Sequence, residues 1–276
     1  MLKKKLSSFY YKHIVNSAVG HRFRQKFKGE QLSELKPYDS SSVVSDLFVW
    51  RSDESWDTRF QLFNISSFLF SEERFYEECE LVFFDNNGIK IKREMLSLAP
   101  FELKTFQISS FLGEAGLGTF AIFHHTAASA KLKDKKCHLT ERGYVGYHRR
   151  GENLVSFCHG NLQALSKTRN SSISSVVGTV KSTTYKPQLI LSDCTDIELI
   201  YTNPTFRKQP IYLNFFDRES RLIKKHEMKI NPLGVQSFIL QNTERLIHTF
   251  ENIGKIVLWR PIIFKYYNSH FDVMHG

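Results

Sequence analysis

Two stretches of the chain have the same order of hydrophobic and polar positions. Residues 81–108 and 213–240 each begin with an apolar run that ends in Phe-Phe-Asp. Each then passes through a polar turn, alternates apolar and basic residues, and enters a further apolar run after a proline. The two align without a gap at a constant separation of 132 residues, which places Phe83-Phe84-Asp85 on Phe215-Phe216-Asp217. The match indicates an internal duplication.

Each stretch is typical of antiparallel sheet. Ile89-Lys90-Ile91-Lys92 alternates at period two, which buries one face of a strand and leaves the other in water. Asn87-Gly88 precedes it and supplies the positive φ angles of a tight hairpin turn. The second copy has Asp217-Arg218-Glu219-Ser220 at this point, without glycine, and we expect a looser connection there. Pro100 and Pro232 are expected between strands, where a missing N–H does no harm.

The likeness continues beyond these stretches. Residues 118–123 align with residues 254–259, and residues 142–160 align with residues 260–276. Both copies then end on His-Gly. In this alignment the first copy carries an insertion at residues 124–141.

Short strands and frequent turn signals predict the fold class. The chain has 276 residues, 41% of them hydrophobic and 14% aromatic, which is enough to bury a sizeable core. We predict an all-β protein of two tandem antiparallel β-sandwich repeats from internal duplication, immunoglobulin-like in architecture. A short basic helical segment is expected to precede them. The predicted organisation is residues 1–42 as basic helix and linker, 43–165 as the first repeat, 166–186 as a Ser/Thr-rich linker and 187–276 as the second repeat.

The net charge of +10 is concentrated at the start of the chain. Residues 1–30 hold eight lysines and arginines against Glu30 alone, so the rest of the chain is nearly neutral. A nucleic-acid-binding domain needs a basic face on its folded body, so nucleic acid is not an expected partner. Aromatic and aliphatic residues interleave with the basic ones, which favours an interfacial helix on an anionic membrane surface. Packing of this segment on the protein's own sheets and a disordered tail are the alternatives.

Cysteine usage and hydropathy bear on the compartment. The four cysteines form no CxxC pair and do not match between the copies, so we expect reduced thiols. No run of about 18 apolar residues and no signal peptide is present. The predicted location is the cytoplasm, where the protein could also attach peripherally to the inner membrane.

The sequence contains little that predicts catalysis or metal binding. Cys137-His138 and Cys158-His159 resemble zinc ligands, but adjacent residues on a strand point to opposite faces. Residues 113–118 are glycine-rich, yet no helix is expected after them, so we interpret them as a turn. GxSxG, HExxH and Walker motifs are missing from the sequence. The prediction is therefore no cofactor and no metal. A metal-dependent enzyme would need several histidines to converge, for which the candidates are His125, His148, His159 and His275.

The most unusual composition lies in residues 142–161, where aromatic, basic and amide side chains gather. Aromatic faces with flanking hydrogen-bond donors suit sugar rings or phosphosugars. The predicted ligand-binding residues are Tyr144, Tyr147, His148, Arg149, Arg150, His159, Asn161, Trp259, Arg260 and His275. The alternative is that Tyr144 and His148 are core and cross-strand residues while Arg149 and Arg150 form a solvated turn.

One family resemblance follows from the second copy. Tyr201-Thr202-Asn203, Phe215-Phe216-Asp217-Arg218-Glu219, Pro232 and the strand leading into Trp259 resemble the sensory rhodopsin transducer family and allied bacterial immunoglobulin-like sandwiches. The resemblance covers about 65 residues of each copy. It implies an oligomeric, non-catalytic sandwich that binds a sugar or a protein partner.

These patterns lead to one functional hypothesis and two alternatives. The hypothesis is a non-catalytic glycan- or glycolipid-binding accessory protein in bacterial surface-polysaccharide assembly. The alternatives are a sugar-modifying enzyme that uses the histidine and arginine cluster, and a structural, transducer-like homo-oligomer. Converging His, Arg and Asp side chains in a deep cleft would favour the enzyme. An open aromatic face would favour the binder, and a flat apolar patch the oligomer.

Overall fold

The computed structural model describes residues 44–128, 131, 140–141, 143–166, 178–241, 246–256 and 260–276. The predicted interfacial helix of residues 1–30 and the Cys137-His138 pair lie outside the described residues, as do Trp259 and residues 167–177 of the predicted linker 166–186. Residues 178–185 of that linker form a strand instead.

A duplicated sandwich is expected to contain two pairs of packed sheets, and the first repeat supplies one such pair. One sheet has the order β10-β1-β6-β3-β4, with β7 beside β1, and the other has the order β5-β2-β8-β9. The strands of this repeat are β1 (Val44–Ser52), β2 (Trp56–Phe63), β3 (Glu77–Asp85), β4 (Lys90–Leu98), β5 (Leu103–Gln107), β6 (Gly116–Thr126), β7 (Thr140–Glu141), β8 (Tyr144–Arg149), β9 (Ser156–His159) and β10 (Asn161–Ser166). Two short helices accompany them, α3 (Ile65–Leu69) and α4 (Ser109–Leu112).

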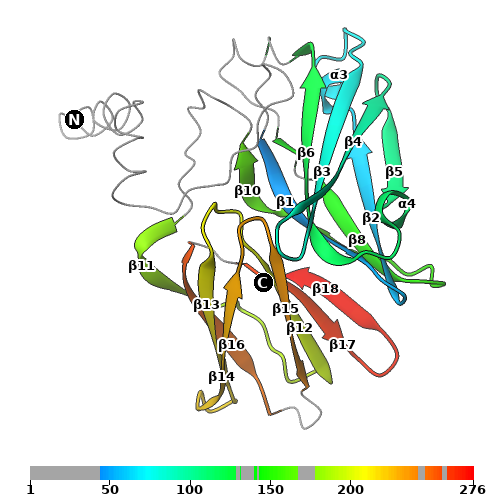
Figure 1. Cartoon of the computed structure of the whole chain (residues 1–276). Coiled ribbons are helices and arrows are strands. Elements are labelled where there is room, and N and C mark those ends of the chain that lie inside the picture. Colours follow the sequence, from blue (N-terminus) through cyan, green and yellow to red (C-terminus); the bar gives the residue numbers. More distant parts are fainter. Residues whose placement is uncertain are drawn as a thin grey trace, which may run out of the picture.

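The second repeat follows the same path through space. Its sheets have the orders β11-β16-β13-β14 and β15-β12-β17-β18, which reproduce β1-β6-β3-β4 and β5-β2-β8-β9 strand by strand. Its strands are β11 (Gly178–Tyr185), β12 (Asp196–Thr202), β13 (Gln209–Phe216), β14 (Leu222–Ile230), β15 (Val235–Gln241), β16 (Thr249–Ile256), β17 (Ile262–Tyr266) and β18 (Phe271–His275). The prediction of an all-β fold made of two antiparallel sandwich repeats is confirmed (Figure 1).

The register of the duplicated hairpins also agrees with the sequence alignment. The β3–β4 ladder shifts between Phe83 and Phe84, and the β13–β14 ladder shifts between Phe215 and Phe216. Phe83 and Phe215 are fully buried, each in the core of its own sandwich. The expectation that one phenylalanine of each pair faces a core is confirmed.

Two expectations were wrong in detail. The turn at residues 217–220 is not looser, because Asp217 and Ser220 make the same backbone hydrogen bonds as Asp85 and Gly88. In both turns the aspartate Oδ1 accepts the N–H four residues later, which holds the turn without a glycine.

The alignment of the following strand was also wrong, by six residues. Phe83 pairs with Phe120 across β3 and β6, and Phe215 pairs with Phe250 across β13 and β16. Phe250 is therefore the counterpart of Phe120, although the sequence alignment placed Ile256 there. The register of β16 is set by its pairing with β13, and the sequence alignment matched residues of similar type that do not occupy equivalent positions.

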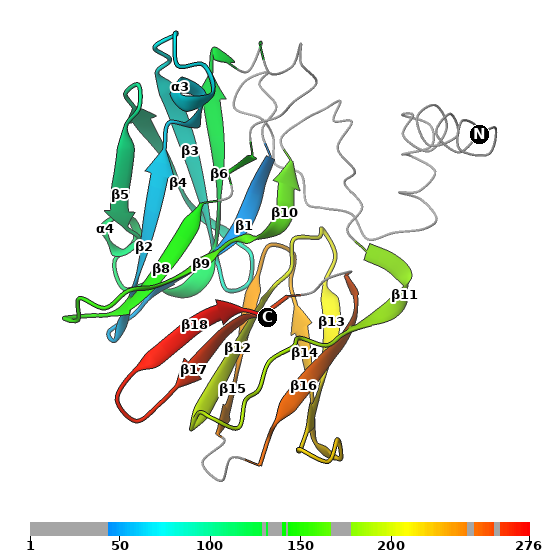
Figure 2. The same ribbon diagram turned by 180° about the vertical axis from the view of Figure 1, so that it is seen from behind.

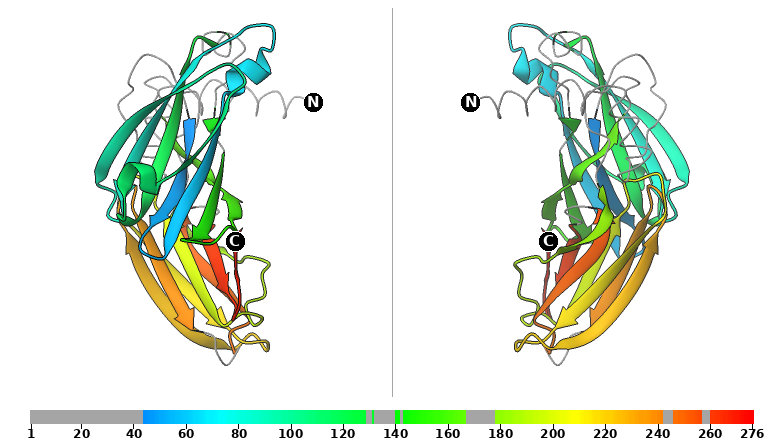
Figure 3. Two further views of the ribbon diagram at one scale, coloured as in Figure 1. Left: turned by 90° about the vertical axis from the view of Figure 1, so that its right-hand side faces the viewer. Right: turned by 90° about the vertical axis from the view of Figure 1, so that its left-hand side faces the viewer.

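The two sandwiches are stacked end to end and share a core (Figures 2 and 3). The ring of Trp56 contacts the ring of Phe271 at 4.7 Å and that of Phe264 at 5.5 Å between centroids. The turn at residues 86–88 packs on the corner at residues 232–234, where Val235 N donates to Asn86 O at 3.0 Å. The part of the outer face of the β15-β12-β17-β18 sheet that lies next to the junction is thereby buried against the first repeat, whereas Ile239 on β15 remains 60% exposed.

Candidate functional site

The β5-β2-β8-β9 sheet of the first repeat is the counterpart of the β15-β12-β17-β18 sheet, and its outer face is accessible. Along β2, Trp56, Phe60 and Leu62 belong to the core, so the alternate residues Arg59 and Gln61 point outward. We call this surface the open face. Its residues are Arg59, Gln61, Phe63, Leu103, Thr105, Gln107, Tyr144, Phe157 and His159.

Two aromatic side chains dominate the open face. Tyr144, the first residue of β8, is 58% exposed, and Phe157 on the edge strand β9 is 42% exposed. Gly146 lies opposite Phe157 in the ladder, and a Cβ at Gly146 would come within 2.6 Å of the Phe157 ring. The Phe157 ring therefore lies over the glycine, on the same face as Tyr144, whose cross-strand partner is His159.

His159 and His275 meet at the edge of the open face, where β9 and β18 lie side by side (Figure 2). Their rings stack at 4.5 Å with an interplanar angle of 16°. Each histidine faces the first residue of its hairpin, Tyr144 for His159 and Ile262 for His275, so the two occupy equivalent positions. The predicted match between the two His-Gly endings is confirmed.

His275 is unsuited to proton transfer near neutral pH. Burial, together with electrostatic interactions with His159 and Arg260, lowers its pKa to about 3. Both ring nitrogens are buried and have no hydrogen-bond partner among the residues that the structure describes. Arg260 itself donates from Nε to the carbonyl of Gly276 at 2.8 Å. An efficient general acid or base needs a pKa near the working pH, which this histidine does not have.

The remaining predicted site residues are distributed over different surroundings. Tyr147 is fully buried and donates its hydroxyl to Val49 O at 3.0 Å, so it is a core residue. His148 is 6% exposed. Arg149 lies over the rings of Trp56 and Phe271 at 5.7 and 5.8 Å. Asn161 begins β10, where its backbone pairs with β1, and its side chain lies outside the described part of the structure.

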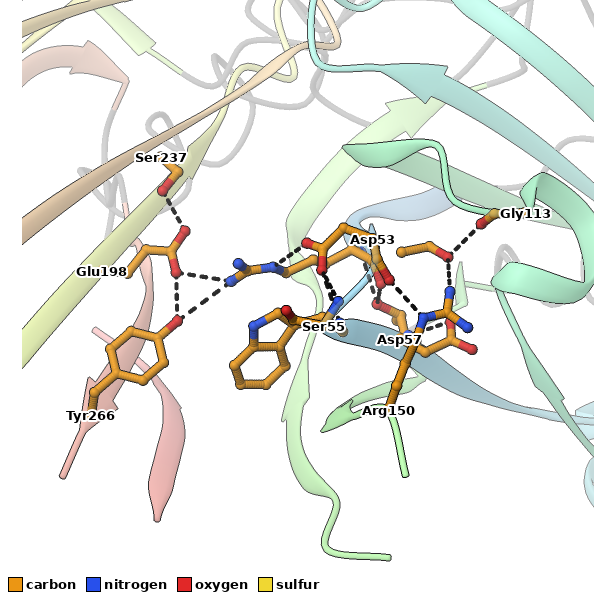
Figure 4. A network of polar contacts seen from close by, with 12 residues as sticks. Asp53, Ser55, Asp57, Gly113, Arg150, Glu198, Ser237 and Tyr266 are labelled. Carbon is orange, nitrogen blue, oxygen red and sulfur yellow. Dashed lines mark hydrogen bonds and ion pairs between the residues drawn. The ribbon is translucent and has the colours of Figure 1, made fainter. Parts of the chain in front are cut away.

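Arg150 belongs to a network of polar contacts that joins the repeats (Figure 4). It donates from Nε to Asp53 O at 2.6 Å. Arg51 binds Asp53 Oδ2 and, across the junction, Glu198 Oε2, each at 3.0 Å. Tyr266 donates to the same Glu198 oxygen at 2.6 Å. The sequence analysis missed this network, because nothing local to Arg51 indicates a partner in the other repeat.

Arg51 also stacks on an aromatic ring at the junction between the repeats. Its guanidinium lies 4.8 Å from the Trp56 ring centroid. Burial alone would lower its pKa, but Glu198 and Asp53 raise it. The network is therefore a fixed, charged structural joint between the two sandwiches.

Three residues of the first repeat could hold a metal ion. Glu77, Cys79 and His124 are buried, and one ligand atom of each lies within 4.8 Å of the others. The sequence alone does not bring them together, because Glu77 and Cys79 lie on β3 whereas His124 lies on β6. The pair that it did consider behaves as expected: Cys158 points into the core, where burial raises its pKa to about 12, and His159 points outward.

Comparisons with known proteins give little guidance. No protein-family model and no curated protein matches the chain. Among solved structures, a beta-glucuronidase from glycoside hydrolase family 2 aligns with 92% of this chain and 26% of its own, at 8% identity and a TM-score of 0.16. A protein described as a beta-galactosidase from Bacteroides fragilis aligns with 90% of this chain and 33% of its own, also at 8% identity and a TM-score of 0.16. The chain thus spans about a third or less of these proteins. Similarity at this level says nothing about what the chain does.

One further property concerns membranes. Within the described part of the chain, no helix has the length and apolar character needed to cross a bilayer.

Proposed function

We propose that the chain is a non-catalytic glycan- or glycolipid-binding accessory protein and that its ligand lies on the open face. The observation that carries this proposal is the exposure of Tyr144 and Phe157 on the same face of the paired strands β8 and β9. Large apolar surfaces left exposed in a cluster commonly mark binding sites.

The composition of the open face suits a sugar. An aromatic ring offers a flat apolar surface to the CH groups of a pyranose, while neighbouring polar groups bond its hydroxyls. Gln61 and His159 flank Tyr144 on the two adjacent strands, and Arg59 follows Gln61 on the same face of β2. A sheet surface of this kind accommodates an extended chain of sugar units.

Two observations support a non-catalytic role. His275, whose pKa is lowered to about 3, stays uncharged across the physiological range. Arg150, the other strong candidate in the predicted cluster, donates to Asp53 O and Ser52 Oγ in the joint between the repeats. These two members of the predicted cluster therefore have structural roles, which supports the binding proposal over the enzyme.

The finer parts of the proposal concern cellular context. We place the protein in bacterial surface-polysaccharide assembly, at the cytoplasmic side of the inner membrane. Residues 1–30 would attach it to anionic lipid through their basic and aromatic side chains. Such attachment would bring the open face close to lipid-linked glycans.

The experiment is glycan-array screening followed by titration of the best ligand, using the full chain and two tyrosine variants. Tyr144→Ala should weaken binding at least tenfold, because stacking of a sugar ring on the tyrosine ring contributes on the order of 1.4 kcal/mol or more to the binding free energy. Tyr212→Ala is the matched control, since Tyr212 is 43% exposed on a strand of the second repeat. Absence of any glycan binding, or equal affinity in both variants, would contradict the proposal. Vesicles with anionic lipid, with and without residues 1–30 on the protein, test the membrane part.

A second candidate function is association with another β-sandwich. Part of the face of the second repeat that corresponds to the open face is buried on the first repeat: Ile262, the counterpart of Tyr144, is 2% exposed, and Val235, the counterpart of Leu103, is 1% exposed. The open face could therefore pack on a second copy of the chain. Light scattering across a concentration series distinguishes the two, because this alternative requires a dimer that Tyr144→Ala converts to monomer.

A further inference from the structure

A cluster of three metal-ligating side chains lies inside the first sandwich, away from the open face. Cys79 on β3 and His124 on β6 are direct cross-strand partners, and Glu77 is two residues from Cys79 on the same face of β3. All three are at most 1% exposed. Antiparallel pairing therefore brings three different ligand types to one point in the core.

The distances fit one small cation. His124 Nδ1 lies 3.1 Å from Glu77 Oε2 and 3.4 Å from Cys79 Sγ. A tetrahedral zinc ion, with bonds of about 2.0 Å to nitrogen and oxygen and about 2.3 Å to sulfur, keeps N and O ligands about 3.3 Å apart and N and S ligands about 3.6 Å apart. The two separations from His124 Nδ1 are within a few tenths of an ångström of these edges, and the sulfur and the carboxylate oxygen lie within 4.8 Å of each other.

The carboxylate is already oriented by a second residue. Ser66 on α3 donates its backbone N–H to Glu77 Oε1 at 3.0 Å, and its hydroxyl also contacts this oxygen. Oε2 is the oxygen that faces His124. Partners that orient a ligand from behind are a regular feature of protein metal sites.

The second repeat shows that the fold does not need these three residues. By strand register, the counterparts of Glu77, Cys79 and His124 are Gln209, Ile211 and Gly254. Gln209 Nε2 donates to Thr205 Oγ1 at 3.3 Å, so a neutral pair takes the place of Glu77 and Ser66. The first repeat alone combines a carboxylate, a thiol and an imidazole at this position.

We propose that Glu77 Oε2, Cys79 Sγ and His124 Nδ1 bind a divalent cation of the zinc class. A mixed sulfur, nitrogen and oxygen set favours zinc over magnesium or calcium, which prefer oxygen alone.

The test is titration of the chelator-treated full chain with cobalt(II), monitored by the thiolate-to-cobalt charge-transfer band. The band should saturate near one equivalent and should disappear in Cys79→Ser. Cys158→Ser, which changes another buried thiol of the same sandwich, should keep it. Glu77→Gln should retain the band and weaken binding at least tenfold.

A further readout keeps the result unambiguous. Glu77→Gln should unfold at nearly the temperature of the metal-free wild type, because Gln209 shows that the amide is compatible with the fold. Absence of the band in the folded wild type, or a band that persists in Cys79→Ser, would overturn the proposal.

Discussion

Gly88 gives the sharpest test of how the two sandwiches are joined. It has a φ of +81°, and a Cβ at this position would lie 1.7 Å from Pro232 O and 2.9 Å from Gly234 N. Those atoms belong to the second repeat and cannot move without displacing the corner at residues 232–234. Gly88→Ser therefore forces the two repeats apart at this contact.

The matched position in the second repeat separates this effect from strain within the turn. Ser220 is the counterpart of Gly88 and adopts a φ of +61° with a side chain present. The turn itself therefore tolerates serine at a cost of about 1–2 kcal/mol. Overlap at the junction adds about 1–3 kcal/mol, as overpacking of a close contact usually does.

The expected destabilisation by Gly88→Ser is about 2–5 kcal/mol. For a chain of this size that corresponds to a fall in melting temperature of roughly 4–20 °C, measured by calorimetry or circular dichroism. Ser220→Gly is the control and should change the melting temperature by only a few degrees, because no other repeat packs there. Equal, small effects of both substitutions would refute the tight junction.

Two other outcomes follow from the junction. Because the pKa of His275 is lowered to about 3 in the folded chain, its contribution to stability is present above the unfolded pKa of about 6.5 and is lost as pH falls, at up to about 1.4 kcal/mol per pH unit. Urea unfolding at pH 7 and pH 5 should show a smaller loss for His275→Gln than for wild type, and parallel losses would contradict the burial of an uncharged imidazole. Truncation after Tyr267 removes Phe271 and Val273, which are 4% and 5% exposed, and should cost about 3–6 kcal/mol by loss of buried area and cavity formation. A truncated chain with an unchanged melting temperature would show that β18 is not part of the core.

The sequence by itself determined those features that depend on neighbouring residues. Alternation at period two specified the β-strands, and the repeated Phe-Phe-Asp pattern specified the duplication and the buried phenylalanines Phe83 and Phe215. The same rule placed Cys158 and His159 on opposite faces. These properties are local, because the direction of a side chain on a strand follows from its position alone.

The candidate site was only partly predictable. Tyr144, His159, Arg260 and His275 were identified from composition, and the structure brings them to one edge of the open face or next to it. Phe157 was not singled out, although its alternation with Cys158 would have placed it on the same face as His159. Tyr147 was included, although the register places it in the core.

Only the tertiary structure decided which distant residues meet. The stacking of His159 on His275, the pairing of Arg51 with Glu198 and the cluster of Glu77 with Cys79 and His124 join different strands or different repeats. The sequence contains each residue but not the strand register or the packing of one sandwich on the other. Those are set by the sum of many weak contacts across the whole core, so no short pattern around any one of these residues encodes them.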